Sequence, residues 1–81
     1  MDADTLYKEY LSGDSAALES LMEIYGDKLT LYINGFVKDL HEAEDLMIEA
    51  FAYLVAKKPH IKASFNSYLY KSARNYALMF L

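Results

Sequence analysis

The apolar residues between positions 18 and 37 recur with helical spacing, and this pattern constrains the fold more than any other feature of the chain. Amphipathic α-helices show such an i, i+3, i+4, i+7 series, with the apolar residues on the buried face. Gly26 and Gly35 weaken the helix locally, each by roughly 1 kcal/mol relative to alanine. The apolar phase continues across Gly26, so the pattern predicts one long helix. Its apolar residues are Leu18, Leu21, Met22, Tyr25, Leu29, Tyr32, Ile33, Phe36 and Val37.

A short helix is predicted before the long one, over about residues 4–11, and the Ser-Gly-Asp sequence that follows ends it. Asp14 or Ser15 can then cap the long helix, because the side-chain oxygen of either residue can accept a hydrogen bond from an exposed backbone N–H group. The two assignments remain open at this point.

A third helix is predicted to begin at about Leu40, after an Asp39 and Glu42 pair that resembles a capping box. It ends near Lys57, because Pro59 disfavours helical conformation at the residue before it. The residues expected to be buried along it are Ala43, Leu46, Met47, Ala50, Phe51 and Leu54.

The stretch His-Ile-Lys-Ala-Ser-Phe-Asn-Ser, residues 60–67, is predicted to contain a loop, with Ser64 as the N-cap of a fourth helix that runs from about Phe65 to the end of the chain. The sequence shows no strand-like alternation, so the predicted fold class is all-α: a small bundle of three main helices plus a short N-terminal helix, in one domain over residues 1–81. The chain stops inside the apolar run Tyr-Ala-Leu-Met-Phe-Leu, so we expect a longer protein. The fourth helix is expected to bury Phe65, Leu69, Ala73, Tyr76 or Ala77, and Phe80.

The composition is that of a globular domain in a reducing compartment. Hydrophobic residues make up 54% of the chain, which is enough for a core, and the absence of cysteine excludes disulfides and cysteine-based metal sites. The N-terminus is acidic, unlike a secretory signal, and no apolar run approaches the ~20 residues of a membrane span. We therefore expect a cytoplasmic protein without membrane insertion.

Charge is divided sharply between the two parts of the chain. Residues 1–50 hold all 12 acidic residues and three lysines, a net charge of −9, whereas residues 51–81 hold five cations and no acidic residue. Such a division favours two different partners, one basic and one anionic. The alternative is that both charged surfaces are simply solvated.

No enzyme motif is present. The His-Glu-Ala-Glu-Asp sequence at positions 41–45 lacks the second histidine of a zinc-binding HExxH motif, and the only other histidine, His60, lies beside a proline. A glycine-rich phosphate loop and a nucleophile elbow are also absent from the sequence. We expect no catalytic residue, no metal site and no cofactor.

The third helix carries an acidic outer face. At ~100° per residue, Asp45, Glu49 and Glu42 point away from the apolar stripe, and Ile48 lies at the border of the acidic face. This face is either a solvated surface with one stray apolar residue or a docking surface for a basic partner, with Ile48 as an apolar contact.

The last third of the chain has the composition of a nucleic-acid contact. Its cations can neutralise phosphates, and its aromatic and amide side chains can stack on bases or form hydrogen bonds with them. The tyrosines could equally be core residues, and a sequence pI near 4.9 indicates that any DNA contact needs a second protein. The polar and aromatic candidates are Lys57, Lys58, Lys62, Asn66, Ser67, Tyr70, Lys71, Arg74 and Asn75.

Three segments, at positions 13–33, 41–54 and 65–77, resemble region 2 of the bacterial extracytoplasmic-function (ECF) sigma factors, which belong to the sigma-70 family. The family patterns run Gly-Asp-x-x-Ala-Leu…Tyr-x-x-Tyr, then Ala-Glu-Asp-Leu-x-Gln-Glu-x-Phe, then Phe-x-x-Trp-Leu-x-x-x-Ala-Arg-Asn. The resemblance covers nearly the whole chain. It implies a helical sigma region 2 fold in a non-enzymatic transcription-initiation factor.

The resemblance also implies two partners. The third helix would dock on the basic clamp helices of the RNA polymerase β′ subunit, with Asp45, Ile48, Glu49 and Glu42 at the contact. The loop and the last helix would bind the non-template strand of the promoter −10 element and help to melt it. The DNA-binding residues would be Lys62, Ser64, Phe65, Asn66, Tyr70, Lys71, Arg74 and Asn75.

Two positions depart from the family pattern. Ile48 stands where the family has glutamine, and Tyr68 stands where it has tryptophan. Nothing in the chain resembles region 4, the helix-turn-helix that reads the −35 element, so either that region lies beyond residue 81 or the protein uses only the region 2 fold. The competing interpretation is a helical protein-interaction module, or a degenerate sigma-like domain bound mainly by an anti-sigma factor.

Overall fold

The computed structural model, which describes residues 2–81, contains four α-helices and no strand within that range. They are α1 (Ala3–Leu11), α2 (Ser15–Val37), α3 (Leu40–Lys57) and α4 (Phe65–Phe80). The predicted all-α fold is confirmed, and α2 is the single long helix that its apolar periodicity predicted.

The helix ends follow from local capping. Asp14, rather than Ser15, caps α2 by accepting a hydrogen bond from the Ala16 N–H, and Asp39 accepts one from the Glu42 N–H at the start of α3. Ser64 caps α4 by accepting from the Ser67 N–H. Each cap satisfies a backbone donor that has no partner within the helix.

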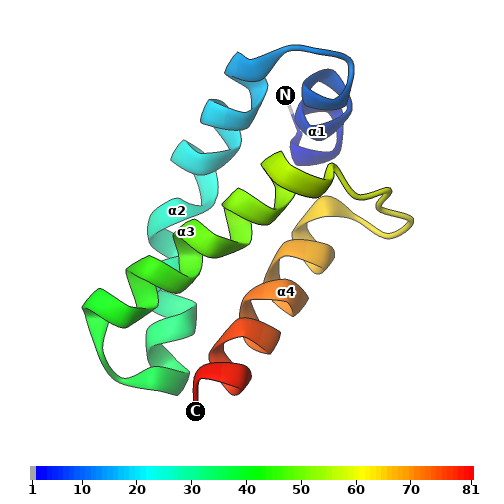
Figure 1. The fold of residues 1–81 in the computed structure, drawn as a ribbon. Helices are drawn as coiled ribbons and strands as arrows, with labels where there is room; N and C mark the ends of the chain where they lie inside the picture. The colour runs from blue at the N-terminus through cyan, green and yellow to red at the C-terminus, as the bar shows by residue number, and fades with distance from the viewer. Residues whose placement is uncertain (1) are drawn as a thin grey trace.

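The helices pack around one apolar core (Figure 1). α2 and α3 form a hairpin, α4 lies against both of them, and α1 packs on α2 and α4 at the end of the bundle where the α3–α4 loop emerges. The largest fully buried side chains are those of Leu21, Leu29, Ile33, Leu54, Phe65 and Leu69.

An aromatic row fills the space between α2 and α4. The Tyr25 ring contacts the Phe65 and Tyr70 rings, with centroids 5.8 and 6.3 Å apart, and the Tyr70 ring meets that of Tyr32 edge-on at 5.0 Å. Such tilted and edge-on contacts each contribute about 0.5–1.5 kcal/mol beyond area burial. The row therefore fixes α4 against α2.

Two expected core residues lie at the surface instead. Phe80 is 47% exposed and Met22 is 37% exposed. The prediction for Phe80 was wrong because the end of α4 after Ala77 is exposed as a whole, and Leu78, Met79 and Leu81 are exposed with Phe80.

Candidate functional site

The outer face of α3 presents the acidic residues that the sequence placed there. Asp45 and Glu49, one helical turn apart, are both exposed, and Glu42 is half-buried near the start of the helix. Ile48 is 48% exposed, so its side chain is available to a partner rather than part of the core. The helical spacing thus placed Asp45, Ile48 and Glu49 correctly relative to the core, whereas Glu42 is less exposed than its position on the helix predicted.

A second apolar residue joins Ile48 on this face. Val55 is 53% exposed and follows Ile48 by seven residues, which places both side chains on one side of α3. Val55 was not among the predicted site residues, although its i, i+7 spacing from Ile48 was a signal that could have identified it. Together, the two side chains form a short apolar edge beside Asp45 and Glu49.

The loop between α3 and α4 carries part of the predicted DNA-binding set at its surface. Lys62 and Ser64 in the loop are exposed, and so is Asn66 in the first turn of α4. Phe65 is different: it is 1% exposed, and its ring packs against the rings of Tyr7 and Tyr25. A direct DNA contact by the Phe65 ring is inconsistent with this burial, so we assign Phe65 to the core.

Helix α4 divides the remaining candidates between two of its sides. Lys71, Arg74 and Asn75 are exposed, as expected for a surface that meets a ligand. Tyr70 is half-buried in the aromatic row against α2, where Tyr25 and Tyr32 cover its ring. Tyr70 therefore lies apart from Lys71 and Asn75, although it is next to Lys71 in sequence.

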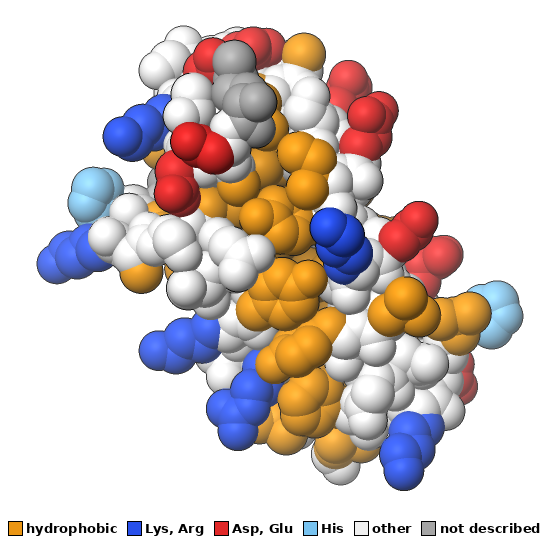
Figure 2. Space-filling view, turned by 180° about the vertical axis from the view of Figure 1, so that it is seen from behind, with side chains coloured by type: hydrophobic (Ala, Val, Ile, Leu, Met, Phe, Trp, Pro, Cys, Tyr) orange, Lys and Arg blue, Asp and Glu red, His pale blue; other side chains and the backbone are white. Residues whose placement is uncertain are grey.

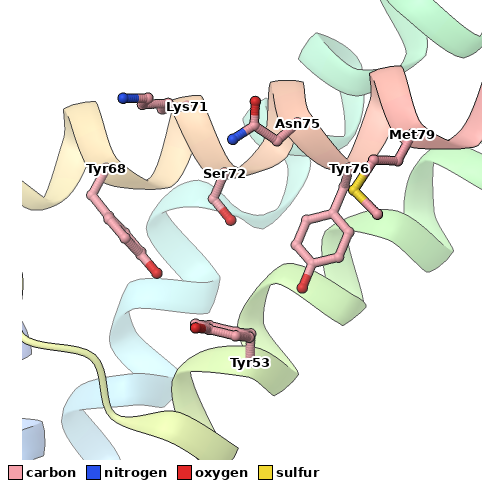
Figure 3. Close-up of a pocket in the computed structure, with 7 residues that line it drawn as sticks. All are labelled: Tyr53, Tyr68, Lys71, Ser72, Asn75, Tyr76 and Met79. Atoms are coloured by element: carbon pink, nitrogen blue, oxygen red, sulfur yellow. The ribbon is translucent and has the colours of Figure 1, made fainter.

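A groove between α3 and α4 adjoins the exposed α4 residues (Figure 3). It has a volume of about 440 Å³, and the tyrosine hydroxyl groups in Figure 3 extend toward the space between the two helices. We call it the tyrosine groove. Its lining residues are Tyr53, Tyr68, Lys71, Ser72, Asn75, Tyr76 and Met79.

The tyrosine groove combines aromatic surface with polar groups. Partial burial raises the pKa of Tyr68 and of Tyr76, so both phenols are protonated at neutral pH and can donate hydrogen bonds. The ammonium group of Lys71 and the amide of Asn75 supply further donors at the rim. Phenol rings, amides and a cation together suit an unpaired nucleobase and its phosphate.

Most residues of the tyrosine groove were not predicted from the sequence. Tyr53, Ser72, Tyr76 and Met79 were not identified as site residues, and Tyr68 was noted only as a departure from the family pattern. A signal was present, since Tyr68, Ser72 and Tyr76 follow one another at four-residue spacing along one side of α4. The contribution of Tyr53 depends on how α3 packs against α4.

A second hollow adjoins the tyrosine groove near the loop. Tyr68 and Lys71 line both spaces, and the second hollow, of about 330 Å³, is otherwise bounded by the loop and Ser67. The two hollows therefore lie next to each other along α4. The loop residues of the second hollow are His60, Ile61, Lys62 and Ala63.

The charge division seen in the sequence is visible on the folded surface. On the face of Figure 2, which views the molecule from behind α3, most Lys and Arg side chains lie along one edge and Asp and Glu side chains gather at the upper end and the opposite edge. A hydrophobic band runs between them. On this face, most of the cations and most of the acidic side chains therefore occupy different parts of the surface.

Residues 2–81 contain neither a candidate metal-binding cluster nor a membrane-spanning helix. No group of three or more His, Cys, Asp or Glu side chains within this range is arranged to hold a metal ion. None of the helices in the same range combines the length and the apolar character that crossing a membrane requires.

Comparison with known proteins agrees with the motif resemblance. No protein-family model matches the chain, and no solved structure matches it. Over 70 residues, or 84% of its length, the chain is 34% identical to the ECF RNA polymerase sigma factor SigW of Bacillus subtilis (strain 168). The match spans 37% of the length of SigW. The similarity supports a relationship to the ECF sigma factors for most of this chain.

Proposed function

We propose that this chain is a sigma region 2 domain, a non-catalytic transcription-initiation module that joins RNA polymerase to promoter DNA in the cytoplasm. The observation that carries the proposal is the 34% identity to an ECF sigma factor over 84% of the chain. The separate acidic and basic surfaces support it, because a sigma domain needs one surface for the polymerase and another for DNA.

The polymerase contact is assigned to the outer face of α3. Asp45 and Glu49 would pair with basic residues of the β′ clamp helices, and Ile48 and Val55 would supply the apolar part of the interface. Exposed ion pairs contribute only about 0–1 kcal/mol each, so the carboxylates would give orientation and speed of association. The apolar edge would add a contribution from its desolvation.

The DNA contact is assigned to the loop, the exposed side of α4 and the tyrosine groove. Extruding a base from the duplex costs a few kcal/mol, and stacking of the extruded base on an aromatic ring contributes about 1–3 kcal/mol of stabilisation. Lys62, Lys71 and Arg74 would neutralise phosphates of the non-template strand along this surface. The net charge of −4 opposes binding by the isolated chain, so we expect tight −10 binding only on the polymerase.

The docking assignment is tested by reversing the charge of α3. We expect Asp45→Lys combined with Glu49→Lys to abolish capture of the chain by immobilised β′ clamp helices, while its helical circular dichroism is retained. The matched control is Glu23→Lys with Asp27→Lys, the same charge change at two exposed positions of α2. Unchanged binding by the α3 variant, or an equal loss in the control, would refute the assignment.

The DNA assignment is tested on the assembled polymerase. Lys71→Ala with Arg74→Ala should reduce promoter opening. The slope of log K against log salt for −10 oligonucleotide binding should also become shallower, by the equivalent of about one to two phosphate contacts. Lys28→Ala with Lys38→Ala removes two exposed cations from outside the loop and α4 and serves as the control. Normal opening by the α4 variant would show that this side of α4 does not contact DNA.

A second candidate function is a protein-interaction module, including a degenerate sigma-like domain bound mainly by an anti-sigma factor. The observation that favours it is Ile48, which replaces the glutamine of the family's docking motif and is 48% exposed. An anti-sigma partner that binds the chain while isolated β′ clamp helices do not would favour this function over the first.

A further inference from the structure

Helix α1 contacts both ends of the loop between α3 and α4. The Asp4 carboxylate accepts a 2.6 Å hydrogen bond from the Phe65 N–H, at the end of the loop. The Tyr7 hydroxyl donates a 2.7 Å hydrogen bond to the Pro59 carbonyl oxygen, near its beginning. These two contacts join residues that lie 61 and 52 positions apart in the sequence.

A third contact from the same side of α1 lies at the end of α3. The Lys58 ammonium nitrogen is 5.6 Å from the centroid of the Tyr10 ring, within the range of a cation–π contact. Asp4, Tyr7 and Tyr10 are spaced three residues apart, so one face of α1 meets the loop.

Two of the three contacts serve backbone groups: the Phe65 N–H donates to Asp4, and the Pro59 carbonyl oxygen accepts from Tyr7. The Phe65 N–H belongs to the first turn of α4, where helical N–H groups have no acceptor within the helix. Ser64 caps the Ser67 N–H, so α4 receives one cap from its own sequence and a second from Asp4. Tyr7 and Tyr10 are buried, at 4% and 7% exposure, so the side chains that α1 contributes to these two contacts are held in place by the core.

The middle of the loop has much less support. His60, Lys62 and Ala63 are exposed, and Ile61 is half-buried. A hollow of about 470 Å³ separates α1 from this part of the loop. The loop is therefore held at its ends by α1 while its central side chains remain accessible.

We propose that α1 positions the α3–α4 loop through Asp4, Tyr7 and Tyr10, and that this positioning sets the loop beside the tyrosine groove for strand capture. The three are positioning residues, since none of them is assigned to a DNA contact. The role in strand capture rests on the proposed sigma function, whereas the effect on loop order does not.

Amide hydrogen exchange of the chain alone tests the loop-order part. Asp4→Ala removes the acceptor of the Phe65 N–H, so that amide should exchange about tenfold faster or more, which is the loss expected for one charge-assisted hydrogen bond. Asp4→Asn keeps an acceptor oxygen and should restore most of the protection. The control is Asp2→Ala, which removes the N-cap of α1 without touching the loop. Equal acceleration in Asp2→Ala and Asp4→Ala, or none in Asp4→Ala, would overturn the proposal.

Limited trypsin digestion tests the contact at the beginning of the loop. Tyr7→Phe retains the ring and loses only the hydroxyl, so cleavage after Lys62 should become several-fold faster while cleavage after Lys28 in α2 does not. Unchanged cleavage after Lys62 would show that the Tyr7 hydroxyl does not hold the loop.

The strand-capture part needs the assembled polymerase. Asp4→Ala with Tyr7→Phe should leave capture by β′ clamp helices unchanged and lower promoter opening several-fold, with Asp4→Asn close to the unmodified protein. If amide hydrogen exchange in the loop becomes faster while promoter opening is unaffected, the role of α1 in strand capture is overturned. If the unmodified protein itself opens no promoter, the proposed function fails, and the exchange result still decides the loop-order part.

Discussion

The Tyr7 hydroxyl hydrogen-bonds to the carbonyl oxygen of Pro59 at 2.7 Å, although 52 residues separate them in the sequence. The bond requires the phenolic proton. Burial raises the pKa of Tyr7 to about 12, which keeps that proton in place well above neutral pH.

Stability at high pH should therefore depend on Tyr7. The pKa of Tyr7 in the folded protein lies above the unfolded value near 10. The contribution of the protonated phenol to the free energy of unfolding is therefore complete below about pH 10. It falls by about 2 kcal/mol as the pH rises through about 12. Tyr7→Phe cannot ionise and should lose less stability over this range. Urea unfolding of both proteins at about pH 9 and about pH 12 measures the difference. Parallel losses in the two proteins would contradict the prediction.

Phe65 should behave as a core residue. Its ring is 1% exposed and packs against Tyr7 and Tyr25, so Phe65→Ala should lower the free energy of unfolding by about 3–5 kcal/mol. The neighbouring exposed residue Asn66 provides the control, since Asn66→Ala should change the free energy of unfolding by about 0.5 kcal/mol or less. Urea unfolding followed by circular dichroism measures both. A loss below about 1 kcal/mol for Phe65→Ala would return Phe65 to the surface candidates.

Ile48→Gln introduces the residue that the ECF sigma pattern carries at the position of Ile48. Ile48 is 48% exposed, so the free energy of unfolding should change by only about 0.5 kcal/mol. We expect tighter binding to the β′ clamp helices, because an amide can donate and accept hydrogen bonds at the interface.

Val55→Gln is the matched control for this change. It makes a similar exposed apolar-to-amide replacement on the same side of α3, at a position where we expect only the apolar contact to be lost. Titration of labelled clamp helices gives both affinities. Weaker binding by Ile48→Gln would identify the isoleucine itself as the better contact.

Lys38 and Lys58 both end a helix in the left-handed backbone region, with φ values of 56° and 43°. Glycine adopts this conformation without strain, so Lys38→Gly should raise the free energy of unfolding by about 0.5–1 kcal/mol. Lys58→Gly should give a smaller gain, because it also removes the contact with the Tyr10 ring. Thermal unfolding of the two variants compares these effects directly. Equal gains would show that the contact between Lys58 and Tyr10 contributes nothing to stability.

The fold and the acidic face were predictable because both depend on local spacing. Asp39 and Ser64 cap the residues three positions ahead of them, and a helical period of 3.6 decides which side chains of α3 point outward. Asp45, Ile48 and Glu49 were therefore placed correctly with respect to the core without any knowledge of the other helices.

The helices and their caps follow from the sequence alone, since each of them arises within a few neighbouring residues, and the division of charge follows from the composition of the two parts of the chain. Tertiary packing decided that Phe65 is buried, that Tyr70 faces α2 and that Tyr53 joins α4 residues in one groove. It also brought Asp4 and Tyr7 to the loop. The physical reason is that such contacts depend on how helices distant in sequence approach one another, and no periodicity within a single helix encodes that approach.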